Sequence, residues 1–332
     1  MDFEKIDELL VGEPLYRISQ VRKSLYKDLI ENWSEATTLP LALREKLNAE
    51  APLEINAEVF ESQNKKTIKA LITLKDKAKI ESVLMRHRDG RNTVCVSSQV
   101  GCPLGCAFCA TGKLGFKRNL NKTEITDQVF LFGRYLKKIG QKVTNIVFMG
   151  MGEPFLNYDN VMGAIYFLND PEGFGLGARN FSISTAGIIE GIKRFSQEKL
   201  EVNLAISLHS PNQEIRSKIM PVNRNYPIGK VLETVAEYVK LRKRKVMFEY
   251  ALIDGVNDSN RDARELARLM KKPLYLVNLI PCNPVPGFSP SSDDRIKKFK
   301  EILEMEGVEA TLRHHFGQDI DAACGQLAAK GN

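Results

Sequence analysis

Residues 95–112 have the sequence CVSSQVGCPLGCAFCATG, which places four of the six cysteines of the chain within fifteen residues. Three of them, Cys102, Cys106 and Cys109, have the spacing C-x3-C-x2-C. The cytosol keeps thiols reduced, and clustered cysteines there more often bind a metal or take part in catalysis than form disulfides. The question is therefore which metal centre three thiolates on one short loop can hold.

Two metal centres fit such a loop in different ways. A structural zinc ion needs four protein ligands. Cys95 is the nearest fourth candidate, whereas His209, His314 and His315 are distant in sequence. An iron–sulfur cluster also takes thiolates, and with only three of them one iron keeps an open position for the amino and carboxylate groups of a ligand. The first centre predicts a zinc-stabilised RNA-binding protein without activity, and the second predicts an enzyme.

The composition predicts a soluble protein with a large hydrophobic core. The chain has 332 residues, of which 43% are hydrophobic, and this is enough for one large domain or a large and a small one. No apolar run approaches a bilayer span, and the N-terminus lacks a signal-peptide pattern. We therefore expect a cytoplasmic protein that does not contact a membrane. The net charge of +7 and the recurring Lys/Arg runs favour an anionic partner such as RNA, although each run alone is typical of a solvated helix face.

The spacing of apolar residues divides the chain near residue 90. Helical spacing over 15–29 and 39–50 is followed by strand-like alternation, with a turn at Asp89–Gly90. We expect a small N-terminal accessory domain at 1–90, helical and then linking strands. The core domain and a catalytic C-terminal segment would occupy 91–332.

The second part of the chain alternates apolar runs with helical patterns. The strand-like runs cover 145–151, 180–186, 202–210, 246–253, 274–281 and 308–316, and the helical patterns include 123–138, 258–271 and 292–306. Strands separated by helices indicate βαβ units and a parallel sheet. Six or more units predict an α/β fold with a partial (β/α)6 TIM-like barrel. In such barrels the chemistry lies at the C-terminal ends of the strands.

Most of these runs end in polar or glycine-rich motifs. In MGMGEP, residues 149–154, the glycines allow a ligand to approach the backbone, and Glu153 supplies a carboxylate. The alternative is a glycine-rich strand end with a solvated glutamate. Together with Gly152 and Glu153, the candidate ligand-binding residues at the strand ends are Ser184, Ser207, Leu208, His209 and Asn283. Each could simply cap a strand, but together they suit a ribose and an adenine.

The cysteine spacing, on a loop after the first barrel strand, resembles that of the radical S-adenosylmethionine (SAM) superfamily. This resemblance implies one 4Fe-4S cluster bound by Cys102, Cys106 and Cys109, whose open iron binds the methionine end of SAM. It also implies that an electron from the cluster splits SAM and yields a 5′-deoxyadenosyl radical. The glycine-and-acid strand end would then bind the SAM amino group, and the later strand ends would bind the rest of SAM.

Ordered motifs along the whole chain resemble those of the RlmN/Cfr family of 23S ribosomal RNA methyltransferases. They include CVSSQVGC, MGMGEP, SLHSPN, MPVNR, NLIPCNP and DIDAACGQL. An isolated cysteine is often a small buried hydrophobe, and we give Cys282 that interpretation. The resemblance instead implies catalytic roles for Cys324, which would carry a methyl group as S-methylcysteine, and for Cys95. The radical would activate the S-methyl group to add to an adenine.

In the same resemblance, Cys95 would attack the bridging sulfur of the RNA–protein adduct. That step would form a disulfide with Cys324 and release the methylated base. Glu81 matches the proton acceptor of the family, and its alternative is an exposed strand glutamate without a role.

Two branches of the family share this chemistry. GEPFLN, FEYALIDGVND and NLIPCNP resemble the branch that methylates C2 of an adenosine in the peptidyl transferase centre of 23S rRNA and of the anticodon-adjacent adenosine in some tRNAs. The alternative is the Cfr-type branch, which methylates C8 of the same ribosomal adenosine. The implied partners are 23S rRNA, tRNA and a cellular electron donor such as flavodoxin, and the N-terminal domain would hold the RNA.

Overall fold

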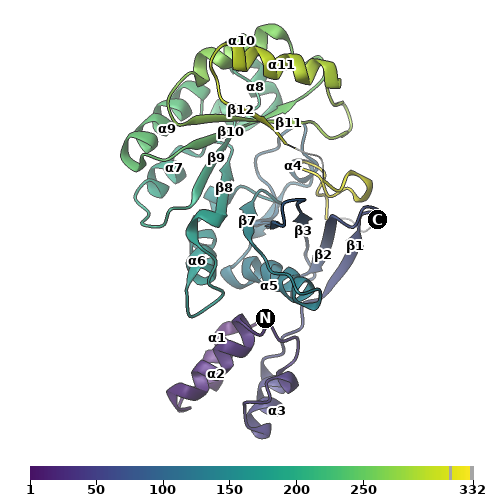
Figure 1. Ribbon diagram of the computed structural model, residues 1–332, viewed down its shortest axis with the longest axis vertical. Coiled ribbons are helices and arrows are strands. Elements are labelled where there is room, and N and C mark those ends of the chain that lie inside the picture. Colours follow the sequence, from purple (N-terminus) through teal and green to yellow (C-terminus); the bar gives the residue numbers. More distant parts are fainter. Residues whose placement is uncertain (314–315, 330–332) are drawn as a thin grey trace.

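The computed structural model describes residues 1–313 and 316–329 and has an α/β fold built around one ten-stranded sheet (Figure 1). Neighbours from β1 to β4 are antiparallel, whereas those from β4 to β12 are parallel. Along the sheet the strands are β1 (Ala57–Glu61), β2 (Thr67–Thr73), β3 (Lys79–Arg86), β4 (Asn92–Cys95), β7 (Asn145–Phe148), β8 (Phe181–Thr185), β9 (Asn203–Ser207), β10 (Val246–Leu252), β11 (Tyr275–Pro281) and β12 (Ala310–Leu312). Within the described residues the outer strands β1 and β12 do not pair with each other, so the barrel is partial.

Helices connect the parallel strands, as expected for βαβ units. They are α5 (Lys122–Lys138), α6 (Tyr158–Asn169), α7 (Ile189–Phe195), α8 (Gln213–Ile219), α9 (Ile228–Arg242), α10 (Asn260–Met270) and α11 (Asp293–Met305). Helix α5 begins with a capping box, in which Asn121 and Glu124 each accept a backbone N–H of the other. Because helices cover the outer face of the sheet, the parallel strands are apolar and mostly buried.

The predicted α/β fold with a partial parallel barrel is confirmed, and the helices predicted at 123–138, 258–271 and 292–306 correspond to α5, α10 and α11. The last predicted strand, 308–316, is shorter than expected. Strand β12 is an edge strand that pairs over three residues with β11 only, and residues 314 and 315 lie outside the described part of the chain.

The first fifty or so residues pack around a second core, which Phe130 of α5 also joins. They form α1 (Phe3–Leu9), α2 (Leu15–Tyr26) and α3 (Leu41–Glu50), which lie at the opposite end of the molecule from α10 and α11 (Figure 1). Trp33 is fully buried there, and its indole N–H donates to the Ala51 carbonyl at 2.8 Å. Strands β1 to β3 instead extend the barrel sheet. The RNA-binding domain at 1–90 stays a prediction. No helix in the described chain has the length and apolar character needed to cross a membrane.

Candidate active site

The three clustered cysteines lie between β5 (Gln99–Gly101) and the short helix α4 (Ala110–Lys113). Strand β5 pairs with β6 (Phe116–Asn119), and this hairpin closes the base of the loop. Gly101 is required at the closure because a Cβ there would lie 1.9 Å from the carbonyl oxygen of Gly115. All three thiols line one cavity, which we call cavity A, together with the C-terminal ends of β7 to β11.

Burial determines the protonation of these thiols. It raises the pKa of Cys102 to about 12 and raises the pKa of Cys106 even further, so a metal centre must displace their protons. Among the described residues, which leave out 314 and 315, no three His, Cys, Asp or Glu side chains lie close enough together to bind a single ion. A cluster of four irons spreads its ligands more widely than one ion does, and a three-thiol loop that leaves one iron open suits it.

The strand end after β7 brings backbone close to cavity A. A Cβ on Gly150 would lie 2.8 Å from the Val96 carbonyl oxygen, and a Cβ on Gly152 would lie 2.6 Å from the Gln99 Cβ. Gly152 also has a φ of +102°, which disfavours side chains. Both positions therefore need glycine, and both line cavity A.

Glu153 is buried rather than solvated, so the alternative of a solvated strand-end glutamate is wrong. Its carboxylate oxygens accept the backbone N–H groups of Phe155 at 3.0 Å and Ala186 at 2.8 Å. Burial raises the pKa of this carboxyl to about 7. The side chain thus joins the ends of β7 and β8 at the wall of cavity A.

A polar cluster lines cavity A opposite the cysteines. The Ser184 hydroxyl donates to Glu249 Oε2 at 3.1 Å and lies 3.2 Å from the Ser207 hydroxyl. The other carboxylate oxygen, Glu249 Oε1, is buried and has no hydrogen-bond partner among the described residues. A buried acceptor that receives no hydrogen bond destabilises the folded protein. Glu249 Oε1 is therefore suited to accept a hydrogen bond from a hydroxyl group of a bound ligand.

His209 is a neutral, fixed part of the same wall. Its backbone has a φ of +57°, its Nδ1 accepts the Ala251 N–H at 2.9 Å, and its ring packs edge-on against Phe108. Burial, followed by the charge of Arg216, lowers the pKa of this histidine to about 3. Because Nδ1 accepts, Nε2 carries the hydrogen. Leu208 is fully buried and is not among the described residues lining the cavity.

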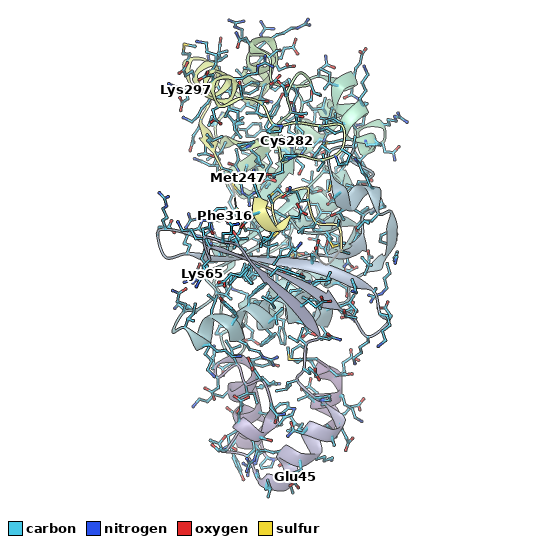
Figure 2. The ribbon with its side chains drawn as sticks, turned by 90° about the vertical axis from the view of Figure 1, so that its right-hand side faces the viewer. Glu45, Lys65, Met247, Cys282, Lys297 and Phe316 are labelled. Atoms are coloured by element: carbon cyan, nitrogen blue, oxygen red, sulfur yellow. The ribbon has the colours of Figure 1, made fainter. Side chains whose placement is uncertain are left out.

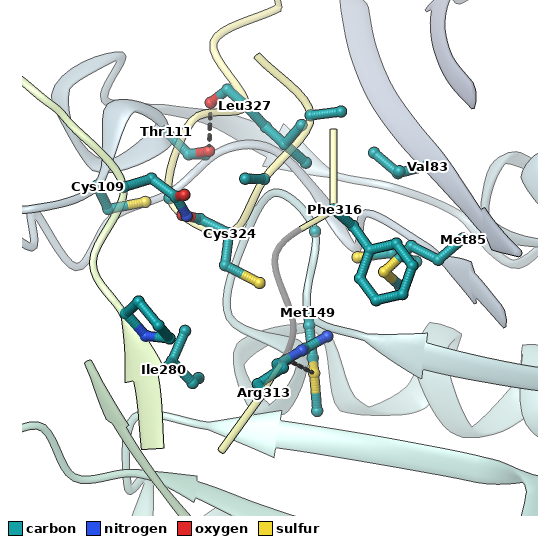
Figure 3. Close-up of a pocket in the computed structure, with 17 residues that line it drawn as sticks. Val83, Met85, Cys109, Thr111, Met149, Ile280, Arg313, Phe316, Cys324 and Leu327 are labelled. Carbon is teal, nitrogen blue, oxygen red and sulfur yellow. Dashed lines mark hydrogen bonds between the residues drawn. The ribbon is translucent and has the colours of Figure 1, made fainter. Parts of the chain in front are cut away.

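A second cavity, cavity B, contains both remaining candidate cysteines (Figure 3). Cys95 ends β4, and Cys324 lies on the C-terminal segment and also lines cavity A. Both are free thiols. Burial, followed by the charge of the nearby Cys324, raises the pKa of Cys95 to about 12. Asn283 lines both cavities, and its Nδ2 donates to the Cys324 carbonyl at 2.9 Å.

Arg313 is the cation that faces both thiols of cavity B. The negative charge of Cys324 is the main cause that raises the pKa of this arginine, and Glu249 and Cys95 contribute less. Its Nη1 lies 3.7 Å from Glu249 Oε1 and 3.7 Å from the Met149 sulfur (Figure 3). The sequence interpretation missed both Arg313 and Glu249. For Glu249 the available indication was a lone charge inside the apolar strand-like run 246–253; Arg313 lies in a polar run that gave no such indication.

The C-terminal segment is fixed across the site by backbone hydrogen bonds. Ala110 N–H donates to the Gly325 carbonyl at 2.7 Å, and the Thr111 hydroxyl donates to the Leu327 carbonyl at 2.6 Å (Figure 3). Ala110 and Thr111 directly follow the last cysteine of the loop. The segment that carries Cys324 is therefore attached to the loop that would hold the cluster.

Glu81 holds the same segment from β3. Its Oε2 accepts the N–H groups of Ala328 at 2.7 Å and Ala329 at 3.1 Å, and its Oε1 lies 3.3 Å from Lys69 Nζ. Glu81 is buried, so the alternative of an exposed strand glutamate is wrong. It does not line either cavity among the described residues, but Val83, two positions along the strand, lines cavity B.

The chain is similar to known proteins over nearly its whole length. Residues 96–268 match the radical SAM superfamily. The chain is 46% identical to a probable dual-specificity RNA methyltransferase RlmN of Dictyoglomus thermophilum, over 99% of this chain and 95% of the relative. A second protein with the same description, from Chloroflexus aurantiacus, is 45% identical over 99% and 92%. The crystal structure of a radical SAM methyltransferase from Sphaerobacter thermophilus superposes with a TM-score of 0.94 at 44% identity, covering 99% of this chain and 98% of that one.

Proposed function

Because this chain belongs to the RlmN family of dual-specificity RNA methyltransferases within the radical SAM superfamily, we propose that it methylates C2 of one adenosine in the peptidyl transferase centre of 23S rRNA and of the anticodon-adjacent adenosine in some tRNAs. One observation carries the proposal. Cys95 and Cys324 line the same cavity, and Cys324 also lines the cavity of the three clustered cysteines. A methyl group on Cys324 would therefore lie between cavity A, where the cofactor would bind, and cavity B, where the target base would bind.

Cys102, Cys106 and Cys109 would hold a 4Fe-4S cluster, with one iron open to SAM. When bound, the cluster supplies the electron that cleaves SAM, and a cellular donor such as flavodoxin would deliver that electron. The chain's own contribution is a closely approaching backbone at Gly150 and Gly152, where any Cβ would clash.

The remaining SAM contacts follow from the polar groups of cavity A. Glu249 Oε1, which accepts no hydrogen bond from the described residues, is suited to accept a ribose hydroxyl, with Ser184 and Ser207 beside it. The His209 Nε2–H is available as a donor, since Nδ1 is engaged with Ala251. Glu153 holds the backbone N–H groups of Phe155 and Ala186, and this backbone would face the SAM amino group. Leu208 is buried at the end of β9 and would support the site without contacting SAM.

Cys324 would carry the methyl group because it is exposed and lines both cavities. The Asn283 amide fixes its carbonyl at 2.9 Å and so limits the positions open to its sulfur. Arg313 places a positive charge beside it.

Cys95 would resolve the RNA–protein adduct. Its thiolate would attack the Cys324 sulfur, and a Cys95–Cys324 disulfide would form. The bond between that sulfur and the base-bound carbon would break with its electron pair left on the carbon, which would take up a proton and become the methyl group. Glu81 would accept the proton that leaves the ring carbon. In the structure its Oε2 accepts from the N–H groups of residues 328 and 329, so this role requires the end of the segment to withdraw when RNA is bound.

Product analysis tests the proposal. The protein is purified anaerobically, its iron and sulfide are measured, and it is incubated with reductant, SAM and unmodified 23S rRNA or tRNA transcripts. We expect about four irons per chain and 2-methyladenosine in the digested RNA. An 8-methyladenosine product would assign the other branch, and iron-free protein with full activity would contradict the mechanism. The matched variant Cys324→Ala should retain its iron and yield no methylated base.

A further inference from the structure

Two neighbouring turns at one end of the antiparallel strands carry a group of cations. Because β1 to β4 are antiparallel neighbours, the turn at 62–66 and the turn at 87–91 lie at the same end of the sheet. Four basic residues lie at or next to these turns, and we call them the basic hairpin patch: Lys65, Lys66, Arg86 and Arg88.

None of the four side chains pairs with a carboxylate within residues 1–313 and 316–329. The Arg86 guanidinium donates to the Lys65 carbonyl at 3.3 Å, which brings the two turns together. Three acids near the turns have other partners: Asp89 pairs with Arg91, Glu61 accepts the Tyr135 hydroxyl, and Asp319 accepts the Gln63 N–H within the 62–66 turn. A shallow cavity between the turns is lined by Asn64, Lys65, Lys66, Arg86, His87, Gly90, Asn92 and Gln141, none of which is acidic.

The patch lies beside the mouth of cavity B. Met85 and Phe316 line that cavity, and the His87 ring packs edge-on against the Phe316 ring at 4.9 Å between centroids. Figure 2 shows Lys65 at the edge of the sheet. Cys95 lies three residue steps along β4 from its first residue, Asn92, a distance of about 10 Å at 3.3 Å per residue.

We propose that the basic hairpin patch binds phosphates of the substrate RNA that flank the target adenosine; this rests on the proposed function. Unpaired cations release counterions from RNA and provide affinity, and phosphate contacts fix register without reading sequence. Such contacts suit an enzyme that acts on two RNAs of different sequence. They also hold the strand on either side of a base that must leave its stack to reach Cys324.

The salt dependence of RNA binding tests the proposal. The triple variant Lys65→Gln/Lys66→Gln/Arg88→Gln is compared with a matched control, Lys77→Gln/Arg264→Gln/Lys297→Gln. The control removes three exposed cations that, in the described chain, have no carboxylate partner and lie elsewhere. The probe is an unmodified tRNA transcript, with binding followed by fluorescence anisotropy under anaerobic conditions.

Each lost phosphate contact reduces the slope of log K against log salt by about 0.7–0.9, so the hairpin variant should lose about 2 from the slope. Between 50 and 200 mM salt the wild type should then lose about 15-fold more affinity than this variant. The control should keep the wild-type slope.

An unchanged slope in the hairpin variant would overturn the proposal, as would an equal loss in the control. It would also be overturned if Arg17→Gln/Arg22→Gln/Lys23→Gln, in the N-terminal helices, accounted for the whole slope. If the triple variant loses its iron, the single variants Lys65→Gln and Arg88→Gln replace it, each with an expected change of about 0.7–0.9. The two hypotheses can be told apart. Wild-type protein that forms no methyladenosine would contradict the proposed function. Active wild-type protein, with variants whose salt dependence of RNA binding is unchanged, would contradict only the role of the basic hairpin patch.

Discussion

Replacing Arg216 should show how much cavity A, the proposed SAM site, depends on one buried side chain. The side chain is fully buried on α8 and donates to the carbonyls that end two strands. The distances are 2.8 Å to Ala186, 3.1 Å to Ser207 and 3.0 Å to Leu208. Its fourth partner is Asn223 Oδ1 at 2.6 Å. One guanidinium therefore fixes the ends of β8 and β9 where they line cavity A.

Arg216→Met removes the guanidinium N–H donors and leaves the carbonyls of Ala186, Ser207 and Leu208 without these hydrogen bonds. Hydrogen bonds to charged groups contribute about 1.5–3 kcal/mol each, while removing a buried charge recovers part of its desolvation cost. We expect the free energy of unfolding to fall by about 3–5 kcal/mol, a large fraction of the 5–15 kcal/mol typical of a folded protein. Burial lowers the pKa of Arg216 to about 10, still above neutrality. The loss should therefore be independent of pH between about 6 and 8.

Urea unfolding followed by circular dichroism measures this change, and equilibrium dialysis measures SAM binding to the reconstituted protein. SAM affinity should fall at least about tenfold, which corresponds to 1.4 kcal/mol. Arg224→Met, at an exposed position on the same segment, is the matched control and should change the unfolding free energy by no more than about 0.5 kcal/mol. A loss below about 1 kcal/mol in Arg216→Met would refute the energetic argument. Lost stability with unchanged SAM affinity would refute the link to cavity A.

Three further changes test other parts of the site. Cys95→Ala should leave the RNA attached to Cys324, detected as a slow band on a denaturing gel; methylated RNA released at the normal rate would contradict a resolving role. Gly152→Ala would place a Cβ 2.6 Å from the Gln99 Cβ at a φ of +102°. It should weaken SAM binding at least about tenfold by dialysis with the iron content retained. Lys69→Met leaves the carboxylate of Glu81 buried without its ammonium partner and should cost about 3–5 kcal/mol in urea unfolding. Adding Glu81→Gln should recover part of that loss, and strict additivity of the two changes would argue against a coupled pair.

The sequence predicts well what depends on local spacing. The period of apolar residues places α5, α10 and α11 and the parallel strands, because a helix or strand buries one face through its own periodicity. The cysteine loop is equally local, since three thiols within eight residues meet in one cavity whatever surrounds them.

Contacts between residues that are far apart in the sequence cannot be predicted from local spacing. Glu249 and Arg313 are 64 positions apart, and only the fold shows that they face each other between the two cavities. Glu81 looks like an ordinary strand glutamate, because its partners Lys69, Ala328 and Ala329 come from another strand and from the C-terminus. The lone charges inside TIKALITL and VMFEYALI indicate special positions, but they do not identify the partner.

The different burial of Cys95 and Cys324 bears on the order in which the proposed mechanism would use them. A thiolate, not a thiol, attacks sulfur, and burial keeps Cys95 protonated by raising its pKa to about 12. Cys324 is exposed beside Arg313 and can take part first. Cys95 becomes a competent nucleophile only when a proton acceptor reaches it or when the segment that carries Cys324 moves. Because that segment is held by Asn283 and Glu81, RNA binding that releases Glu81 would both free the carboxylate and change the surroundings of Cys95. Resolution before an adduct forms would then be suppressed by the protonation of the resolving thiol itself.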